Sequence, residues 1–128
     1  MAVTYPTAVK TARMTAVRDQ IDAGGAAGKL EICSTGYASI LATITLGYSG
    51  ASTGTVSGTV LTLAGFPRSD TSADNTGTAA VARIRTSANA DVITGLTVGL
   101  SGSDINLDSL SITATQTVTI NSAAITHA

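Results

Sequence analysis

Tryptophan is absent from this sequence, cysteine and histidine occur once each, and aromatic residues make up only 3%. Zinc sites draw most of their ligands from Cys and His, so this composition excludes one. The single Cys33 cannot form an intrachain disulfide, and its strand-like surroundings predict a small buried thiol. His127 is the penultimate residue, in a tail that we expect to be disordered, so we predict no Ser-His or Cys-His catalytic pair.

Charge is also scarce, at 12% of residues with a formal net charge of −1. Such a weak field does not gather DNA or an anionic membrane, so we expect no nucleic-acid partner and no membrane partner. Residues 1–6 lack the basic start and apolar run of a signal peptide. Threonines interrupt every apolar run well short of the roughly 18 residues of a transmembrane helix. We therefore expect synthesis in a cytoplasm.

One acidic segment, residues 70–77, resembles the start of an EF-hand calcium loop. The match fails because Asn75 stands where the loop needs glycine and Val81 where it needs its bidentate glutamate. Asx turns and hydroxyl caps explain the same residues. Turn and strand-entry chemistry also explains a second alternating set: Asp104, Asn106 and Asp108. We predict no metal site.

No other catalytic pattern is visible. Hydrolysis of a glycoside by two carboxylates would have to use Asp70 with Asp74 or Asp104 with Asp108, and neither pair has an aromatic platform for a sugar. The Gly24-Gly25 pair follows a predicted helix and precedes a strand, which is the wrong order for a phosphate loop or a dinucleotide fingerprint. We predict no enzyme activity, no catalytic residue and no cofactor.

Residues 6–23 form the one predicted helix. Pro6 suits the first helical position, and Gly24-Gly25 supplies the stop. The apolar residues of this segment fall into two narrow stripes, Tyr5, Val9, Ala12 and Ala16 on one and Met14, Val17 and Ile21 on the other. Either the helix simply covers its own sheet, or it contacts two surfaces, its own sheet and a neighbouring subunit.

Strand patterns dominate the rest of the chain. The predicted strands are 29–34, 39–48, 55–64, 78–85, 92–100 and 110–120, with a short last segment at 123–126. Turn residues separate them at the close spacing typical of an antiparallel sandwich, and no connection is long enough for a parallel βαβ unit. We predict one mainly β domain, residues 1–128, with an N-terminal α-helix at 6–23 and an antiparallel, jelly-roll-like β-sandwich at 29–126.

Alternation is clearest in 110–120, where every even position except Gln116 is apolar and the odd positions are Ser111 and the threonines 113, 115, 117 and 119. In the predicted strand 78–85, the positions that face outward are Val81, Arg83 and Arg85. The two arginines are either solvated or ion-paired, or they contact a carboxylate-bearing partner.

No lysine follows Lys29, so edge strands lack a common defence against pairing with the strands of another chain. Either the chain covers its own edges, or they are buried in an oligomer, which the low charge slightly favours.

A family resemblance covers most of the chain. Residues 69–85 (Ser-Asp-Thr-Ser-Ala-Asp-Asn-Thr-Gly-Thr-Ala-Ala-Val-Ala-Arg-Ile-Arg) and 92–107 (Val-Ile-Thr-Gly-Leu-Thr-Val-Gly-Leu-Ser-Gly-Ser-Asp-Ile-Asn-Leu) resemble a family of small structural proteins of tailed bacteriophages and prophages. Residues 5–17 and 27–32 resemble its opening helix and first strand. Family members often carry an aromatic pair before Arg-Ile, where this chain has residues 80–82, Ala-Val-Ala.

The resemblance implies a structural component of a tailed-phage virion, made in the bacterial host cytoplasm, and favours a capsid decoration or cement protein that stabilises the head lattice. The implied partners are the major capsid protein or other virion proteins, with a homo-oligomer, dimer or trimer. The alternatives are a head–tail connector, collar or tail accessory protein, a glycan or host-surface binding module, or a binding domain unrelated to particles. A glycan module would have to use these rings: Tyr5, Tyr37, Tyr48 and Phe66.

Overall fold

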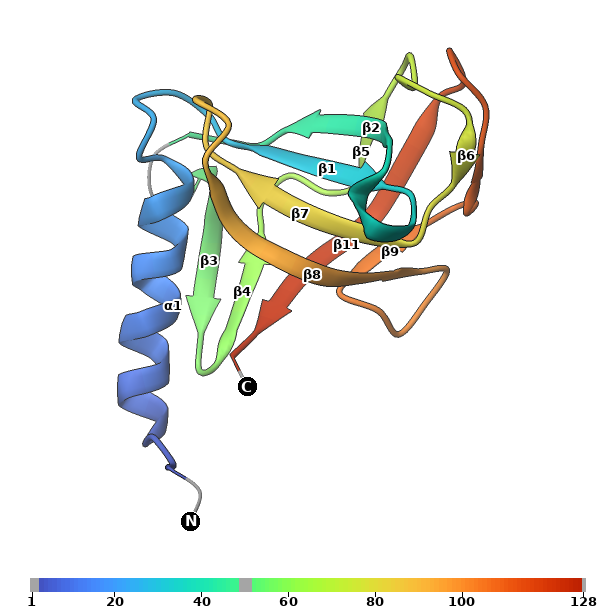
Figure 1. Cartoon of the computed structure of the whole chain (residues 1–128). Helices are drawn as coiled ribbons and strands as arrows, with labels where there is room; N and C mark the ends of the chain where they lie inside the picture. The colour runs from blue at the N-terminus through green and yellow to red at the C-terminus, as the bar shows by residue number, and fades with distance from the viewer. Residues whose placement is uncertain (1–2, 49–51, 128) are drawn as a thin grey trace.

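The computed structural model describes residues 3–48 and 52–127, and Figure 1 shows the path of the chain. Within these ranges one α-helix, α1 (Thr7–Ile21), is followed by strands and a short 3-10 turn, η1 (Thr35–Tyr37). The strands are β1 (Lys29–Cys33), β2 (Ile40–Thr45), β3 (Gly54–Ser57), β4 (Val60–Leu63), β5 (Arg68–Asp70), β6 (Gly77–Thr78), β7 (Val81–Arg85), β8 (Asp91–Gly99), β9 (Ile105–Leu107), β10 (Ser111–Ile112) and β11 (Val118–Thr126).

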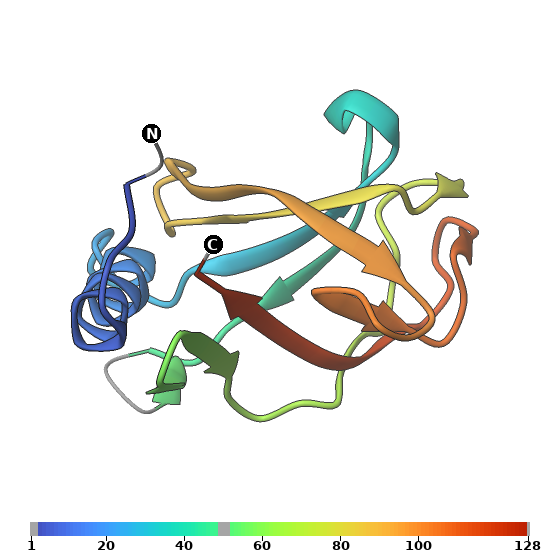
Figure 2. The ribbon, with the colours of Figure 1, turned by 90° about the horizontal axis from the view of Figure 1, so that it is seen from below.

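Nine of the described strands form one sheet in the order β2-β1-β7-β8-β9-β11-β4-β3, with β5 paired to β11, while β6 and β10 form a small separate pair. The sheet curls around its own interior. Figure 2 shows β1 and β7 on one side and β11 on the other, with α1 at one end. The predicted mainly β fold with an N-terminal helix is confirmed, and the curled sheet is compatible with a sandwich or a half-barrel. The jelly-roll connectivity is not confirmed.

One pair of strands departs from the predicted antiparallel arrangement. Strands β8 and β9 run parallel, with Val98 opposite Ile105. Only residues 100–104 connect them, far fewer than the dozen or more of a usual parallel crossover. Asp104 stabilises this loop, because its carboxylate accepts the Thr97 N–H at 3.0 Å and its own N–H donates to the Thr97 hydroxyl at 2.9 Å.

Two predicted strands are broken by turns. The segment 55–64 is a hairpin of β3 and β4, which reverses at Gly58, a residue with a φ of 58° that favours glycine. The segment 110–120 is interrupted between β10 and β11, where Thr115 has a φ of 73° and its N–H donates to the Ala73 carbonyl at 2.9 Å. Strand β11 then continues without a break through the separate segment predicted at 123–126.

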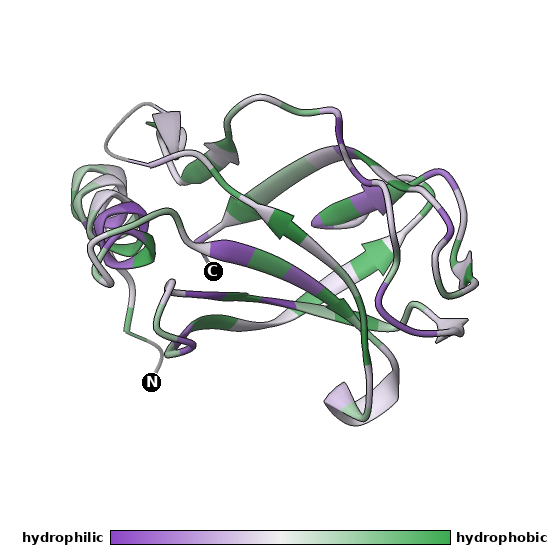
Figure 3. Ribbon diagram, turned by 90° about the horizontal axis from the view of Figure 1, so that it is seen from above, coloured by the Kyte–Doolittle hydropathy of each residue, from purple (hydrophilic) through white to green (hydrophobic). Residues whose placement is uncertain are grey.

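The interior is filled by small aliphatic side chains, as the composition predicts. Figure 3 shows hydrophobic and hydrophilic residues alternating along the strands. The fully buried large residues come from both sides of the curled sheet and from the helix: Ile21, Leu30, Ile32, Leu41, Leu61, Ile84, Ile105, Leu107, Ile112 and Ile120. In 110–120 the predicted inward parity holds at Ile112, Val118 and Ile120 even though the strand is broken.

The helix packs against its own sheet through one of its two predicted stripes. Met14 and Ile21 are buried, and Val17 packs against the same core. The other stripe is exposed, with Tyr5 at 42% and Val9 at 40% of their full accessibility. Pro6 is the N-cap residue rather than the first helical one. The helix therefore covers the sheet in cis and leaves an apolar face free in the single chain.

The edge strand β2 is covered by the chain itself. Residues 68–75 run along its outer edge and hydrogen-bond to it at both ends and in the middle. The four bonds are Asn75 Nδ2 to Ile40 O (2.8 Å), Asp74 N to Leu41 O (2.8 Å), Thr43 N to Asp70 Oδ2 (2.9 Å) and Arg68 Nη1 to Thr45 O (2.7 Å). For β2, internal cover replaces the missing lysines.

The cis packing of α1 predicts unequal effects of truncating its two stripes. We expect Ile21→Ala to lower the free energy of unfolding by about 2–5 kcal/mol, because the side chain is fully buried between helix and sheet. The control Val9→Ala, on the exposed stripe, should change it by less than about 0.5 kcal/mol. Urea unfolding followed by circular dichroism measures both. Equal small effects would show that the helix does not pack on the sheet.

Candidate functional site: an arginine cluster and a helix groove

A charged cluster lies on the outer face of β1, β7 and β8. Glu31 in β1 stands opposite Arg83 in β7, and Arg83 Nε donates to Glu31 Oε1 at 2.7 Å. The two side chains are only 4% and 13% exposed. Arg85, two residues along and therefore on the same face, lies 3.7 Å from the same oxygen and donates to Asp91 Oδ1 at 2.7 Å. The predicted outward arginines are thus ion-paired within the chain.

Tyr37 closes the cluster from the side. The Arg83 guanidinium lies 5.1 Å from the centre of its ring, and its hydroxyl accepts the Gly95 N–H at 2.6 Å. Tyr37 has a φ of 59°, an uncommon conformation for a residue with a side chain. The ring contact and the hydroxyl bond together hold η1 against the sheet.

Electrostatics make this cluster a structural unit rather than an acid–base pair. Burial opposes the charge of Arg83, but the hydrogen bond and negative charge of Glu31 outweigh it and raise the pKa of the guanidinium. Arg83 therefore stays charged at any working pH. Burial raises the pKa of the neighbouring Cys33 thiol, although Arg83 acts in the opposite direction. Cys33 is fully buried, as predicted, and its thiol is protonated at neutral pH.

The acidic segment 70–77 hydrogen-bonds to the edge of β2. Asp70 Oδ1 accepts the Ser72 N–H at 3.0 Å, which is an Asx turn, while Oδ2 accepts the Thr43 N–H. Asp74 accepts the Thr43 hydroxyl at 2.9 Å. These bonds support the predicted turn role. Within residues 3–48 and 52–127, no three side chains of His, Cys, Asp or Glu are grouped so that they could hold a metal ion.

The second acidic set has local partners too. Asp104 holds Thr97, as described above, and Asn106 accepts the Ser103 N–H at 3.0 Å. Asp108 accepts the Asn121 side-chain amide at 2.8 Å. The expectation of a disordered tail at His127 is wrong, because the His127 N–H donates to the Thr59 carbonyl at 2.8 Å.

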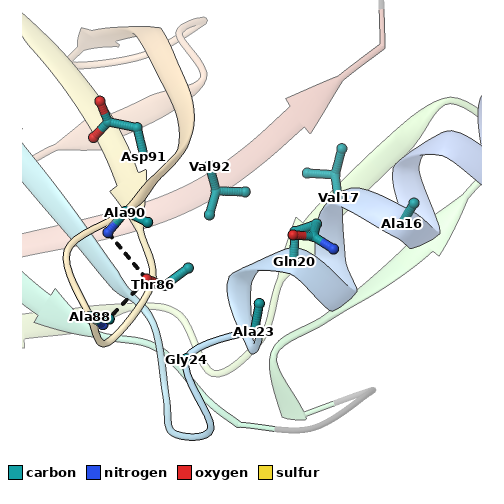
Figure 4. A pocket seen from close by; sticks show the side chains of 10 residues that line it. All are labelled: Ala16, Val17, Gln20, Ala23, Gly24, Thr86, Ala88, Ala90, Asp91 and Val92. Carbon is teal, nitrogen blue, oxygen red and sulfur yellow. Dashed lines mark hydrogen bonds between the residues drawn. The ribbon is translucent and has the colours of Figure 1, made fainter.

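A groove of about 530 Å³ lies between α1 and the β7–β8 hairpin. Figure 4 shows Val17 and Gln20 of the helix facing Val92 across it. Thr86 shapes the hairpin wall, since its hydroxyl accepts the N–H groups of Ala88 and Ala90 at 3.2 Å each. Its lining is mostly small and apolar: Ala16, Val17, Gln20, Ala23, Gly24, Thr86, Ala88, Ala90, Asp91 and Val92.

The sequence reasoning did not predict this groove. Its walls come from segments more than sixty residues apart, which only the fold brings together. The available signal was the pair of helical stripes, since Ala16 of one and Val17 of the other both line the groove. A second, polar hollow of about 450 Å³ is lined by Thr43 of β2 and by Arg68 and Asp70, which already bind the edge of that strand.

The aromatic side chains are scattered. An arginine lies over one face of three of the four rings: Arg13 over Tyr5 at 4.5 Å, Arg68 over Phe66 at 5.7 Å and Arg83 over Tyr37. The fourth ring, Tyr48, is exposed at the end of the segment after β2. The four rings therefore do not form one platform for a ligand.

In comparisons with known proteins, no family model, no curated protein and no solved structure matches the chain. The resemblance to tailed-phage proteins therefore stays a prediction. Among the described residues, no helix has the length and apolar character that a membrane span requires.

Neutralising Glu31 tests the cluster. Because Glu31→Gln leaves the nearly buried Arg83 without its counter-charge, we expect a loss of about 3 kcal/mol in the free energy of unfolding. The matched control is Asp91→Asn, which removes the more exposed partner of Arg85 and should cost less than about 1 kcal/mol. Urea unfolding at neutral pH compares the two variants. A larger effect of Asp91→Asn would contradict the central position of Glu31.

Cys33 should resist alkylation in the native protein. The raised pKa favours the neutral thiol in the fold. The stability this provides is present below the thiol's unfolded pKa and is lost as the pH rises through the folded pKa. At pH 7.5, roughly one unit below an ordinary thiol pKa, we expect iodoacetamide to label the native protein at least about tenfold more slowly than the urea-unfolded chain. Mass spectrometry over time measures both rates. Equal rates would contradict the buried, neutral thiol.

Proposed function

We propose that this protein is a structural component of a tailed-phage virion, and specifically a capsid decoration or cement protein that stabilises the head lattice. It would be made in the host cytoplasm and located in the virion, as a homo-oligomer bound to the major capsid protein. The resemblance in residues 69–85 and 92–107 suggests the particle. The structure supports a role in contact rather than chemistry, through the surface at the start of the chain.

The supporting observation is an exposed apolar patch at the N-terminal end of α1. Val3 is 77% exposed and lies with Tyr5 and Val9 at the end of the helix that projects past the sheet (Figure 1). In a chain with so little charge, such a patch marks a surface that another protein covers. A cement protein needs a contact of this kind, since it binds many equivalent sites on a lattice of coat subunits.

A second surface offers hydrogen bonds. Thr113, Thr115 and Thr117 are exposed in the turn between β10 and β11, while Thr119 bonds to the Ser69 hydroxyl at 3.0 Å. The exposed hydroxyl row in this segment therefore consists of the first three threonines only. Hydroxyl groups of this kind supply short-range contacts to a neighbouring subunit without adding net charge.

The two alternatives are separated by different observations. A connector, collar or tail accessory protein would use the same apolar patch but would be present in few copies. A glycan-binding module would need a free aromatic face, and an arginine lies over one face of Tyr5, Tyr37 and Phe66. Tyr48 is the exposed ring on which that alternative would depend.

Copy number tests the proposal. We expect quantitative mass spectrometry of purified particles to find this protein in amounts comparable to the major capsid protein, because a cement protein occupies every equivalent lattice site. Particles that lack it should lose their genome at a lower temperature than complete particles. Tens of copies or fewer would favour the connector or tail role. Absence from particles would overturn the proposal.

A further inference from the structure

The groove opens onto the exposed face of α1. Ala16 and Gln20 form part of its helical wall (Figure 4). Ala12 and Val9 continue the same face toward the N-terminus at helical spacing, and both are exposed. The alanines keep the face shallow, so a second helix could approach to about 8–10 Å. Groove and helix face therefore form one surface along the length of α1.

The two ends of this surface carry opposite charge. Residues 3–13 contain Lys10 and Arg13 and no acidic residue, which gives a formal charge of +2. At the groove end, Asp91 is paired with Arg85 and Asp22 accepts the Thr53 hydroxyl, while Asp19, 3.6 Å from Arg18, keeps a side chain that is 62% exposed. The helix macrodipole has the same direction, positive at the N-terminus and negative at the C-terminus. When the surface is turned end for end, Arg13 of one copy can therefore meet Asp19 of the other.

The positive end also presents a side chain that suits the groove. Tyr5 lies under the Arg13 guanidinium, close to the exposed Val9. A pocket of about 530 Å³ has room for one aromatic ring and an aliphatic neighbour. Gln20 extends into the groove, where its amide can both donate to and accept from the tyrosine hydroxyl, which needs a partner when buried.

We propose that two copies of this chain pair through antiparallel α1 helices, with Tyr5 of each copy in the groove between α1 and the β7–β8 hairpin of the other. The arrangement is isologous, so each contact occurs twice. It places the N-terminal half of each helix, with Arg13, against the groove end of its partner, where Asp19 is exposed. This inference deepens the proposed function, because it rests on the homo-oligomer named there and identifies the second copy as its partner.

The pairing is weak in isolation. A helix of 15 residues is about 22 Å long, so one helical face with the groove buries less than the roughly 800 Å² per partner of a standard interface. We expect a dissociation constant of about 10–100 μM. Binding of both copies to one lattice would strengthen it through the high effective concentration of the second contact.

Sedimentation velocity over a range of concentrations tests the pairing. We expect the wild-type protein to dimerise and Ala16→Glu, which places a charge in the groove wall, to weaken dimerisation at least tenfold. The matched control Ala26→Glu adds the same charge at an exposed residue outside the surface and should leave it unchanged. Thermal melting checks that both variants are folded.

Two variants with reversed charges, one at each end of the surface, provide a second test that does not depend on Ala16→Glu. Arg13→Glu and Asp19→Lys should each weaken self-association, since Asp19 is 62% exposed at the negative end. An equimolar mixture of the two should pair more tightly than either alone, because each altered end then meets its complement. A wild-type monomer at about 1 mM, unchanged dimerisation of Ala16→Glu, or no recovery in the mixture would overturn the pairing.

The outcomes separate this inference from the proposed function. A monomeric protein found in many copies on particles overturns the pairing alone. A dimer that is absent from particles overturns the virion role alone. If Ala16→Glu prevents binding to particles while the wild type is monomeric, the groove takes the coat protein and not a second copy.

Discussion

The hydrogen bonds between residues 68–75 and the edge of β2 are the constraint on which the rest of the architecture depends. Asp70, Arg68 and Asn75 supply them from side chains, and Asp74 supplies one from its backbone. Because β5 also pairs with β11, these bonds connect the first edge of the curled sheet to its far side. These bonds hold the sheet closed around a core of small aliphatic residues, although β2 and β5 are not paired as strands. The carboxylate of Asp70 takes part in these bonds, and that of Asp74 accepts the Thr43 hydroxyl, so an acidic segment with alternating oxygens has a structural use.

The Glu31 cluster connects neighbouring strands on the outer face of that sheet. Glu31 is buried on the outer face, and its charge is balanced by two arginines from the neighbouring strand. Buried ion pairs of this type add little net stability over an apolar pair, but they are strongly destabilising when one partner is lost. Their main effect here is positional. They fix the register of β1 against β7 and, through the ring of Tyr37, the position of η1.

Burial in 110–120 could be predicted from the sequence, but strand continuity could not. In 110–120 the inward parity was correct at Ile112, Val118 and Ile120, because alternation depends only on which residues are apolar. The turn between them was missed, since threonine rarely adopts the positive φ of Thr115 and long-range hydrogen bonds, to the Ala73 carbonyl and the Thr76 hydroxyl, stabilise the turn. The two stripes of α1 were visible in the sequence. The groove beside one of them was not, because the β7–β8 hairpin that forms its second wall is brought there by long-range pairing.

Because residues 68–75 cover the outer edge of β2, the protein has fewer ways to assemble with other chains. A strand such as β2, whose outer N–H and C=O groups are already bonded, does not template a strand from another chain, so assembly by sheet extension is disfavoured there. Contacts between subunits then have to use side-chain surfaces. The described surface has little charge, and its large exposed apolar residues are concentrated near the start of α1. The lysine-free strands therefore do not indicate an oligomer by themselves. The indication comes from the helix, where one stripe packs into the core and the other faces outward beside a groove.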